Sequence, residues 1–239
     1  MIKGILFDKD GTLIEFNQLW HSIFQSFFQK LEKEYQISKK TIEEIKIISG
    51  FLEDRFEKES MIQYLATSDI MNLWYQIITK NETSNGSFYE ENKLTDLLEE
   101  QALNQNIEFK VLDGVTELLK YLKEKGYFLG VATADTRKLT DNSLKKTGIL
   151  EYFDYIGCDE LGVQPKPSAQ MALRFCDNVK IGMDEVLIVG DSVTDMQFAE
   201  NAGAEFVGIR TTYNHYQEFE QKNKKMVENI KDIIERYAL

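Results

Sequence analysis

Six polar residues stand where an apolar segment or a turn of the sequence ends, and their types could support phosphoryl chemistry. They are Asp8, Asp10, Thr133, Lys166, Asp191 and Asp195. The apolar segments that precede them, such as residues 5–7 and 186–189, are short and continuous, which predicts buried β-strands. Because ligands bind beyond the carboxyl ends of the strands in open parallel sheets, we expect these six side chains to converge on one site.

The composition of this predicted site indicates its chemistry. Several carboxylates crowded together are costly unless a cation joins them, and the chain has only two histidines, so all-oxygen ligation of Mg²⁺ is expected. A lysine and a threonine hydroxyl suit the binding of a phosphoryl group. One carboxylate of the first pair could then attack phosphorus to form an aspartyl-phosphate, while the other transfers protons.

The elements that position these residues follow from hydrophobic periodicity. After about residue 106, strand-like segments at 128–132, 155–158, 186–189 and 206–209 alternate with amphipathic helical segments. Together with the strand at 5–7, this alternation predicts an α/β domain with a parallel sheet covered on both sides. The tail from about Met226 predicts a closing helix with Ile230, Ile233 and Ile234 on one face.

The stretch from residue 15 to residue 106 contains no comparable strand. Its apolar residues recur at helical spacing, and Asn85-Gly86 marks a turn between helices. The repeated positions include Leu19, Ile23, Phe27 and Leu31, then Ile42, Ile45 and Ile48, then Leu94, Leu97 and Leu98. We therefore predict an all-helical domain at 15–106, inserted into a core formed by 1–14 and 107–239.

The composition excludes several classes of protein. The 239 residues carry a net charge of −12, which argues against nucleic-acid binding and against a polybasic membrane anchor. No apolar run reaches the roughly 18 residues of a membrane span, and the first residues do not resemble a signal peptide. Cys158 and Cys176 have neither a disulfide framework nor a metal spacing, so we expect reduced thiols in a cytoplasmic protein.

The motifs resemble those of a known superfamily. Asp8-Lys9-Asp10-Gly11-Thr12, Thr133, Lys166 and Gly190-Asp191-Ser192-Val193-Thr194-Asp195 are similar to the four motifs of the haloacid dehalogenase superfamily. The resemblance spans the chain and includes a helical cap inserted after the first motif, as in the phosphoglycolate-phosphatase-like branch. It implies a Rossmann-like core with the first strand central, and a Mg²⁺-dependent phosphatase that acts on a small phosphorylated metabolite.

The resemblance also implies a role for each motif residue. Asp8 would be the nucleophile, and Asp10 would be the general acid and then the general base. Thr133 and Lys166 would hold the phosphoryl oxygens. The metal would be bound by Asp8, the main-chain carbonyl of Asp10, Asp191 and Asp195, the last directly or through water. Dehalogenases and phosphonatases of the superfamily lack the second aspartate of the first motif, so Asp10 favours phosphate-ester hydrolysis or phosphomutase chemistry.

Residues of the predicted cap could contact the substrate. Glu15, Trp20, His21 and Arg55 are the candidates, although a surface or core role is the simpler interpretation of each. Asp135 adds a carboxylate close to Thr133. It could weaken the binding of strongly anionic substrates, or it could cap the next helix.

Several functions remain open on the same residues. A β-phosphoglucomutase-like phosphomutase is the close alternative, and pyrophosphatase or nucleotidase activity is also compatible with the motifs. A phosphate-dependent binding module without turnover would be favoured by a changed Asp8, Asp10 or Lys166, and all three are intact. Nothing in the sequence distinguishes a monomer from a homodimer.

Overall fold

The computed structural model describes residues 1–57, 60–82, 92–104, 107–210 and 216–239. Contacts between residues divide the chain into two compact units. Met1–Glu15 and Phe109–Leu239 form one, here called the α/β unit, and Phe16–Glu108 form the other, the helical unit. The sequence analysis placed the corresponding boundaries after residues 14 and 106. The turn predicted at Asn85-Gly86 lies outside the described residues.

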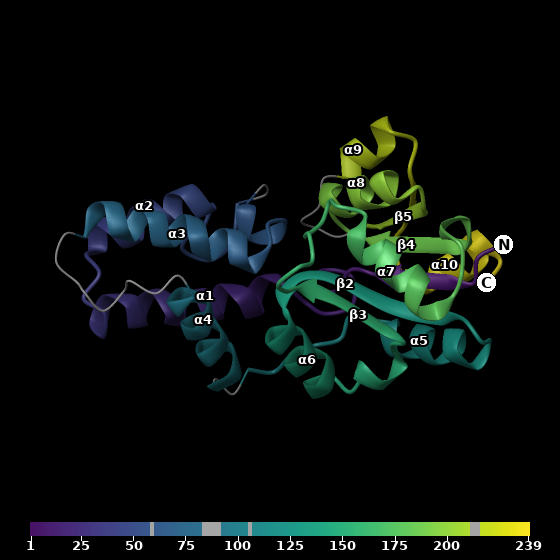
Figure 1. Cartoon of the computed structure of the whole chain (residues 1–239), viewed down its shortest axis with the longest axis horizontal. Coiled ribbons are helices and arrows are strands. Elements are labelled where there is room, and N and C mark those ends of the chain that lie inside the picture. Colours follow the sequence, from purple (N-terminus) through teal and green to yellow (C-terminus); the bar gives the residue numbers. More distant parts are fainter. Residues whose placement is uncertain (58–59, 83–91, 105–106, 211–215) are drawn as a thin grey trace. The chain divides into compact units, whose positions relative to one another are not determined.

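A six-stranded sheet forms the centre of the α/β unit (Figure 1). All pairings between neighbouring strands are parallel, and the strand order is β3-β2-β1-β4-β5-β6. The strands are β1 (Gly4–Phe7), β2 (Phe128–Thr136), β3 (Tyr155–Asp159), β4 (Val186–Gly190), β5 (Glu205–Ile209) and β6 (Lys225–Val227). The first strand is therefore central, as the resemblance implied.

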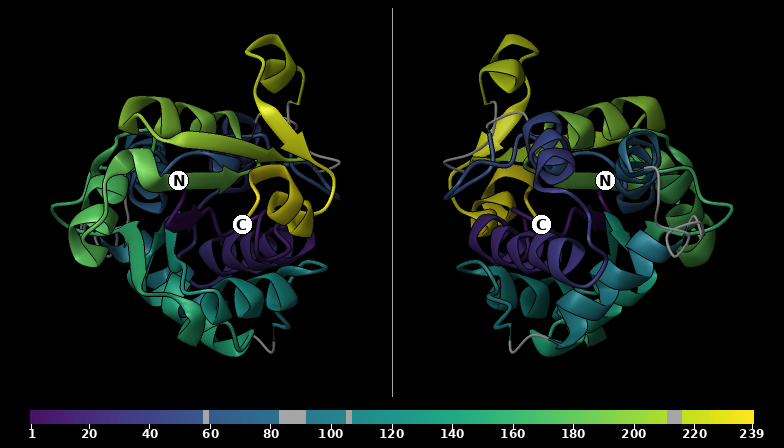
Figure 2. Two further views of the ribbon diagram at one scale, coloured as in Figure 1. Left: turned by 90° about the vertical axis from the view of Figure 1, so that its right-hand side faces the viewer. Right: turned by 90° about the vertical axis from the view of Figure 1, so that its left-hand side faces the viewer.

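Helices cover both faces of this sheet (Figure 2). Apolar residues of α5 and α6 pack in one core cluster with η4 and α10, whereas those of α7, α8 and α9 pack in a second cluster on the opposite face. The bounds are α5 (Val115–Glu124), α6 (Arg137–Lys146), α7 (Gln170–Val179), α8 (Val193–Ala202), α9 (Tyr216–Gln221) and α10 (Ile233–Tyr237), with short 3₁₀ turns η2 (Leu150–Tyr152), η3 (Met183–Glu185) and η4 (Ile230–Asp232).

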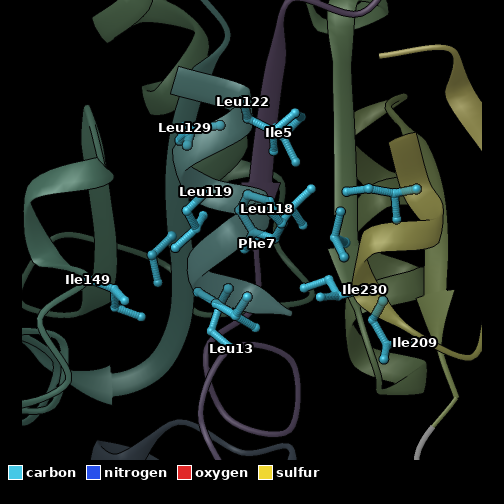
Figure 3. Packing of buried hydrophobic residues seen from close by; sticks show 14 of the residues in the cluster. Ile5, Phe7, Leu13, Leu118, Leu119, Leu122, Leu129, Ile149, Ile209 and Ile230 are labelled. Carbon is cyan, nitrogen blue, oxygen red and sulfur yellow. The ribbon is translucent and has the colours of Figure 1, made fainter. Parts of the chain in front are cut away.

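The central strand is buried on both faces because its side chains alternate between the two clusters. Ile5 and Phe7 pack against Leu118, Leu119 and Leu122 of α5 in the first cluster (Figure 3). Leu6 belongs to the cluster on the other face. This arrangement explains why the sequence of β1 is a continuous apolar run, in contrast to the alternating pattern of a strand with one wet face.

Two strands differ from the prediction. β2 continues three residues past Thr133, through a register irregularity against β3 between Ala132 and Thr136. The helix expected from about Met226 is wrong at its start, because Lys225–Val227 form β6 and pair with β5 at the edge of the sheet. A three-residue edge strand is too short to show a period, whereas Ile230 and Ile233 are buried in η4 and α10 as expected.

The helical unit consists of four helices and one short turn in its described part. They are α1 (Asn17–Lys33), α2 (Lys39–Ser49), η1 (Met61–Gln63), α3 (Thr67–Asn81) and α4 (Lys93–Asn104). Aromatic side chains of α1 form much of its core. Phe24, Phe27 and Phe28 all lie within 6 Å of the Trp74 ring of α3, measured between ring centroids.

The buried face of α2 differs from the prediction at one position. Ile42 and Ile45 are buried, but Ile48 is 44% exposed. The buried stripe continues instead at Ser49, four residues after Ile45, where the serine hydroxyl accepts a hydrogen bond from Trp74 Nε1 at 2.7 Å. A buried serine with a partner cannot be recognised from hydrophobic spacing alone.

Two predictions about the chain as a whole have a counterpart in the structure. Cys158 and Cys176 are both free and buried, and burial raises the pKa of the Cys158 thiol to about 11. No helix in the described residues is both long enough and apolar enough to cross a membrane.

Candidate active site

The first aspartate lies at the point where the strand order reverses. From β1 the chain continues to β2 and β3 on one side, and it then crosses to β4 on the other side. Asp8 follows the last residue of β1, and its main-chain N–H donates to the carbonyl of Val189 in β4 at 2.8 Å. Such a switch point leaves a crevice outside the carboxyl ends of the two strands, which is where ligands bind in open α/β sheets.

Three carboxylates meet at these strand ends. One oxygen each of Asp8, Asp191 and Asp195 lies within 4.8 Å of the others, a spacing that one metal ion could bridge. Asp191 follows β4 directly, and Asp195 lies in the first turn of α8. Asp8 and Asp191 therefore come from the ends of neighbouring parallel strands, and Asp195 comes from the helix that follows β4.

Lys166 lies against two of these carboxylates. Its Nζ atom lies 2.6 Å from Asp8 Oδ1 and 2.6 Å from Asp195 Oδ1. The lysine side chain is only 6% exposed, so its charge depends on these partners. An ammonium has three N–H donors, and two are used here, which leaves one for a phosphoryl oxygen.

The charges in this group do not balance. With every group ionised, the three carboxylates and the one ammonium carry two excess negative charges in a largely buried site. Burial raises the pKa of Asp8 to about 7, although the ammonium of Lys166 opposes this shift. Partial burial and the charge of Asp8 hold the pKa of Asp191 well above its usual range. An all-oxygen donor set with two uncompensated charges fits a divalent cation such as Mg²⁺.

Two glycines leave space for two of these carboxylates. A Cβ atom on Gly11 would lie 2.5 Å from Asp191 Oδ2, and a Cβ atom on Gly190 would lie 2.5 Å from the Asp195 side chain. Gly11 also has a φ of 84°, in the left-handed region that other residues rarely adopt. The glycines of the first and last motifs are therefore required by the position of the aspartates.

Asp195 is held by the N-terminal cap of α8. The Ser192 hydroxyl donates to Asp195 Oδ2 at 2.6 Å. The main-chain N–H of Asp195 donates to that hydroxyl, and the main-chain N–H of Ser192 donates to Asp195 Oδ2, both at 3.1 Å. This reciprocal capping box fixes the carboxylate before any ligand binds. The other oxygen, Oδ1, accepts from Lys166.

The second aspartate of the first motif takes part in a different contact. Asp10 Oδ2 lies 2.5 Å from Nζ of Lys9, and the same Nζ lies 3.0 Å from Asp135 Oδ2. Burial alone would lower the Lys9 pKa, but the carboxylates of Asp10 and Asp135 outweigh it and raise this pKa above its ordinary value. Burial raises the pKa of Asp135 to about 6, although Lys9 opposes the shift. Lys9 is thus a buried ammonium between two carboxylates.

Thr133 is a buried residue of β2, three residues before the end of the strand. Its hydroxyl oxygen accepts a hydrogen bond from the main-chain N–H of Asp135 at 3.2 Å, so its own proton can still be donated. Asp135 does not cap α6, because that cap is Thr136, whose side chain accepts from the N–H of Leu139. Phosphoryl binding by Thr133 and Lys166 stays a prediction.

The predicted substrate residues of the cap fall into two groups, two buried aromatic side chains and two charged ones. Trp20 is buried and packs near Phe24, with ring centroids 5.7 Å apart. His21 is also buried, where it stacks on Phe51 and its Nε2 lies 2.9 Å from the carbonyl oxygen of Leu52. These contacts give both residues a structural role in the helical unit.

The two charged candidates are Arg55 and Glu15. Arg55 is 61% exposed and pairs with the adjacent Asp54. Glu15, expected to open the cap, belongs to the α/β unit, where its main-chain N–H donates to the carbonyl of Lys110. Substrate contact by Glu15, Trp20, His21 or Arg55 stays a prediction.

Sequence reasoning gave no role to two residues of the site. Lys9 lies between the two aspartates of the first motif, two residues after a buried apolar strand, and a lysine there cannot be buried without a counter-charge. Ser192 was noted only as part of the last motif. The spacing Ser192-x-x-Asp195 matches a capping box and predicts the reciprocal bonds that the structure shows.

The comparison with known families agrees with this arrangement. A family model described as "Haloacid dehalogenase-like hydrolase" matches residues 5–209. The chain belongs to this family. The matched region begins within β1 and ends at the last residue of β5, so it includes all four predicted motifs.

Relatives and solved structures show the same likeness. A Clostridium perfringens (strain 13 / Type A) protein named "Putative pyrophosphatase PpaX" is 30% identical over 216 residues, which cover 89% of this chain and 86% of that protein. The phosphate complex of CbbY from Rhodobacter sphaeroides matches with a TM-score of 0.71 and 16% identity, covering 96% of this chain and 95% of that one. A structure described as a "predicted phosphoglycolate phosphatase" from Haemophilus somnus has a TM-score of 0.71, 21% identity and coverage of 99% and 98%. These structural matches confirm the predicted α/β fold.

Proposed function

We propose that this family member is a Mg²⁺-dependent phosphatase of small phosphomonoesters, acting through an aspartyl-phosphate on Asp8. The observation that carries the proposal is the convergence of Asp8, Asp191 and Asp195 within 4.8 Å, with Lys166 Nζ 2.6 Å from Asp8. A carboxylate that is both a nucleophile and a neighbour of a cation site suits attack on an anionic phosphoryl group.

The first half of the reaction uses both aspartates of the first motif. A carboxylate oxygen of Asp8 bonds to phosphorus, and the bond from phosphorus to the ester oxygen breaks. The leaving alkoxide takes a proton from the Asp10 carboxyl group, so the alcohol departs neutral. Lys166 and Thr133 hold the phosphoryl oxygens, using the third N–H of the ammonium and the O–H of the threonine.

The second half releases phosphate and restores the enzyme. Asp10, now a carboxylate, takes a proton from water, and the water oxygen bonds to phosphorus. The bond between phosphorus and the Asp8 oxygen breaks, which regenerates the Asp8 carboxylate and frees inorganic phosphate. Asp8, Asp191, Asp195 and the Asp10 carbonyl would hold Mg²⁺, which when bound screens the repulsion between the anionic substrate and the Asp8 carboxylate.

A second candidate is the hydrolysis of inorganic pyrophosphate. The relative at 30% identity carries a pyrophosphatase name, and its match covers most of both chains. The same residues would serve, because phosphate can replace the alcohol as the group that leaves phosphorus. The net charge of −12 favours a small metal-chelated anion over a nucleic acid as the substrate in either case.

The test is phosphate release from a panel that contains glycerol 3-phosphate, phosphoglycolate, a hexose phosphate, a nucleoside monophosphate and pyrophosphate. Each compound is measured with Mg²⁺ and with EDTA, for the wild type, Asp8→Asn and Asp10→Asn. The control is Asp177→Asn, which changes an exposed carboxylate of α7.

Mg²⁺-dependent release that both site substitutions abolish and the control retains would support the proposal. The preferred compound then distinguishes an ester phosphatase from a pyrophosphatase. Release that persists in Asp8→Asn, or no release from any compound, would overturn it.

A further inference from the structure

Lys9 lies between two carboxylates that belong to neighbouring strands. Its side chain is completely buried, and its Nζ atom lies 2.5 Å from Asp10 Oδ2 and 3.0 Å from Asp135 Oδ2. Asp10 follows β1, whereas Asp135 lies near the end of β2, which pairs with β1. The ammonium therefore joins the first motif to the strand that carries Thr133.

The main chain on both sides of this bridge is fixed. The carbonyl of Lys9 accepts hydrogen bonds from the N–H groups of Leu13 and Ile14, at 2.9 and 3.0 Å. On the other side, the N–H of Asp135 donates to the hydroxyl of Thr133. A single ion pair lets an ammonium move around its partner, whereas ion pairs to two fixed segments restrict its position.

Leu13 and Phe7 hold the ends of the loop that carries Asp8 and Asp10. Both are fully buried in the first core cluster, and Figure 3 shows their side chains in this core. The loop between them is short, so the direction of the Asp10 side chain remains its main freedom. The contact with Lys9 limits this freedom, since an ion pair at 2.5 Å favours the Asp10 rotamers that keep the carboxylate beside the ammonium.

We propose that Lys9 is a positioning residue that holds the Asp10 carboxyl group in the orientation needed for proton transfer, with Asp135 as its second anchor. This inference rests on the proposed function, because it assigns Lys9 a role only if Asp10 exchanges protons with the leaving group and with water. Lys9 touches neither substrate nor the reacting phosphorus in this account. It acts through Asp10.

The competing interpretation is that Lys9 only neutralises buried carboxylates. The two interpretations differ for the double variant Lys9→Met/Asp135→Asn, which removes the ammonium together with the charge of its second anchor. If Lys9 only neutralises, the double variant regains much of the stability and activity lost by Lys9→Met. If Lys9 positions Asp10, the double variant regains stability but not the steps that need a proton from Asp10.

The measurement compares two probe substrates by kcat/KM, which reports the steps up to departure of the leaving group. Glycerol 3-phosphate releases an alkoxide that needs a proton, whereas 4-nitrophenyl phosphate releases a stabilised phenolate that does not. We expect the double variant to lose about 100-fold on glycerol 3-phosphate and about threefold or less on 4-nitrophenyl phosphate, since a positioned general acid contributes about 10²- to 10⁴-fold. The thermal midpoint is measured for each variant to confirm folding.

Two further variants sharpen the comparison. Lys225→Met/Glu205→Gln removes a lysine–carboxylate pair of the same unit, 3.0 Å apart but exposed, and we expect it to leave both substrates unaffected. In the background of Asp10→Asn, adding Lys9→Met/Asp135→Asn should cause no further loss on glycerol 3-phosphate, because a residue that acts only through Asp10 has nothing left to position.

The outcomes distinguish failure of the positioning role of Lys9 from failure of the proposed phosphatase function. Equal losses of the folded double variant on both substrates, or additive losses in the Asp10→Asn background, would overturn the positioning role and leave the phosphatase function intact. Wild-type protein that hydrolyses neither probe and no compound of the phosphate-release panel would overturn the proposed function, and the inference with it. A selective loss on glycerol 3-phosphate supports both.

Discussion

Nζ of Lys166 lies 2.6 Å from Oδ1 of Asp8, although 158 residues separate them in the sequence. Asp8 follows the central strand, and Lys166 lies in the connection between β3 and α7. The parallel sheet joins them, because the carboxyl ends of β1 and β3 lie at the same edge. The lysine ammonium offsets part of the negative charge of the Asp8, Asp191 and Asp195 carboxylates, which would otherwise repel one another strongly.

Replacing this lysine should affect catalysis more than folding of the metal-bound protein. Lys166→Met removes a charge that faces both the nucleophile and the phosphoryl group, so we expect kcat/KM to fall by about 10²- to 10³-fold. Steady-state phosphate release with saturating Mg²⁺ measures this, with Lys222→Met as a control at an exposed pair with Glu200. A loss below about tenfold would contradict the role of Lys166 in phosphoryl binding.

Gly11→Ala should weaken metal binding beyond the cost of its backbone conformation. Gly11 and Gly126 both have a φ of 84°, but a Cβ atom on Gly11 would collide with Asp191, whereas one on Gly126 would meet nothing within 4 Å. Each substitution costs about 1–2 kcal/mol of backbone strain. Only Gly11→Ala should also raise the Kd for Mg²⁺, as measured by calorimetric titration. Equal Mg²⁺ affinity in the two variants would be evidence against Asp191 as a ligand.

The metal-free protein should lose stability as pH rises through the site's titration range. Burial raises the pKa of Asp8 from 3.8 to about 7. Between these values the folded chain holds a proton that the unfolded chain has released, so this residue's contribution to the free energy of unfolding falls as pH increases. Denaturation with EDTA from about pH 4 to about pH 8 should show a steeper fall for the wild type than for Asp8→Asn. Parallel curves would contradict the shift.

Added Mg²⁺ should reverse this loss. Metal ligands must be ionised, so the metal competes with protons and its stabilising effect grows with pH. The rise in thermal midpoint on adding Mg²⁺ should therefore be larger at about pH 8 than at about pH 5. An equal rise at both values would place the ion elsewhere than among these carboxylates.

The helical unit offers a test that separates packing from substrate contact. Trp20 is 4% exposed within the aromatic core, so Trp20→Ala should lower the free energy of unfolding by about 3–5 kcal/mol. Arg55 is exposed beside Asp54, so Arg55→Ala should change stability by less than about 0.5 kcal/mol. Any change in KM for Arg55→Ala therefore reports substrate contact directly. A stable Trp20→Ala variant would contradict the structural role of Trp20.

The sequence was most informative where burial is complete. Val186–Gly190 and residues 129–132 of β2 appear as continuous runs without polar side chains because both faces of their strands are covered. The convergence of Asp8, Asp191 and Asp195 followed from the geometry of parallel strands, which places their carboxyl ends together. The sequence was least informative at the edge, where β6 has three residues and Lys225 is exposed.

The contacts of individual polar side chains could not be predicted in the same way. The sequence predicts that Asp135 either weakens the binding of strongly anionic substrates or caps the next helix, whereas the structure pairs it with Lys9. Which of several carboxylates a buried ammonium contacts depends on the register between β1 and β2, and a single sequence does not contain that register. Ser49 and Ser192 show the same limit, since each is defined by its partner.

The central claim is that Asp8 carries the phosphoryl group, and Asp10→Asn makes it directly observable. With 4-nitrophenyl phosphate and Mg²⁺, this variant should still form the aspartyl-phosphate, because the phenolate leaves without a proton, but it should hydrolyse that intermediate slowly. Rapid mixing should show a stoichiometric burst of 4-nitrophenolate, and acid-quenched peptides should carry the phosphoryl group on Asp8. Hydrolysis without a burst, or a phosphoryl group on any other residue, would contradict the account.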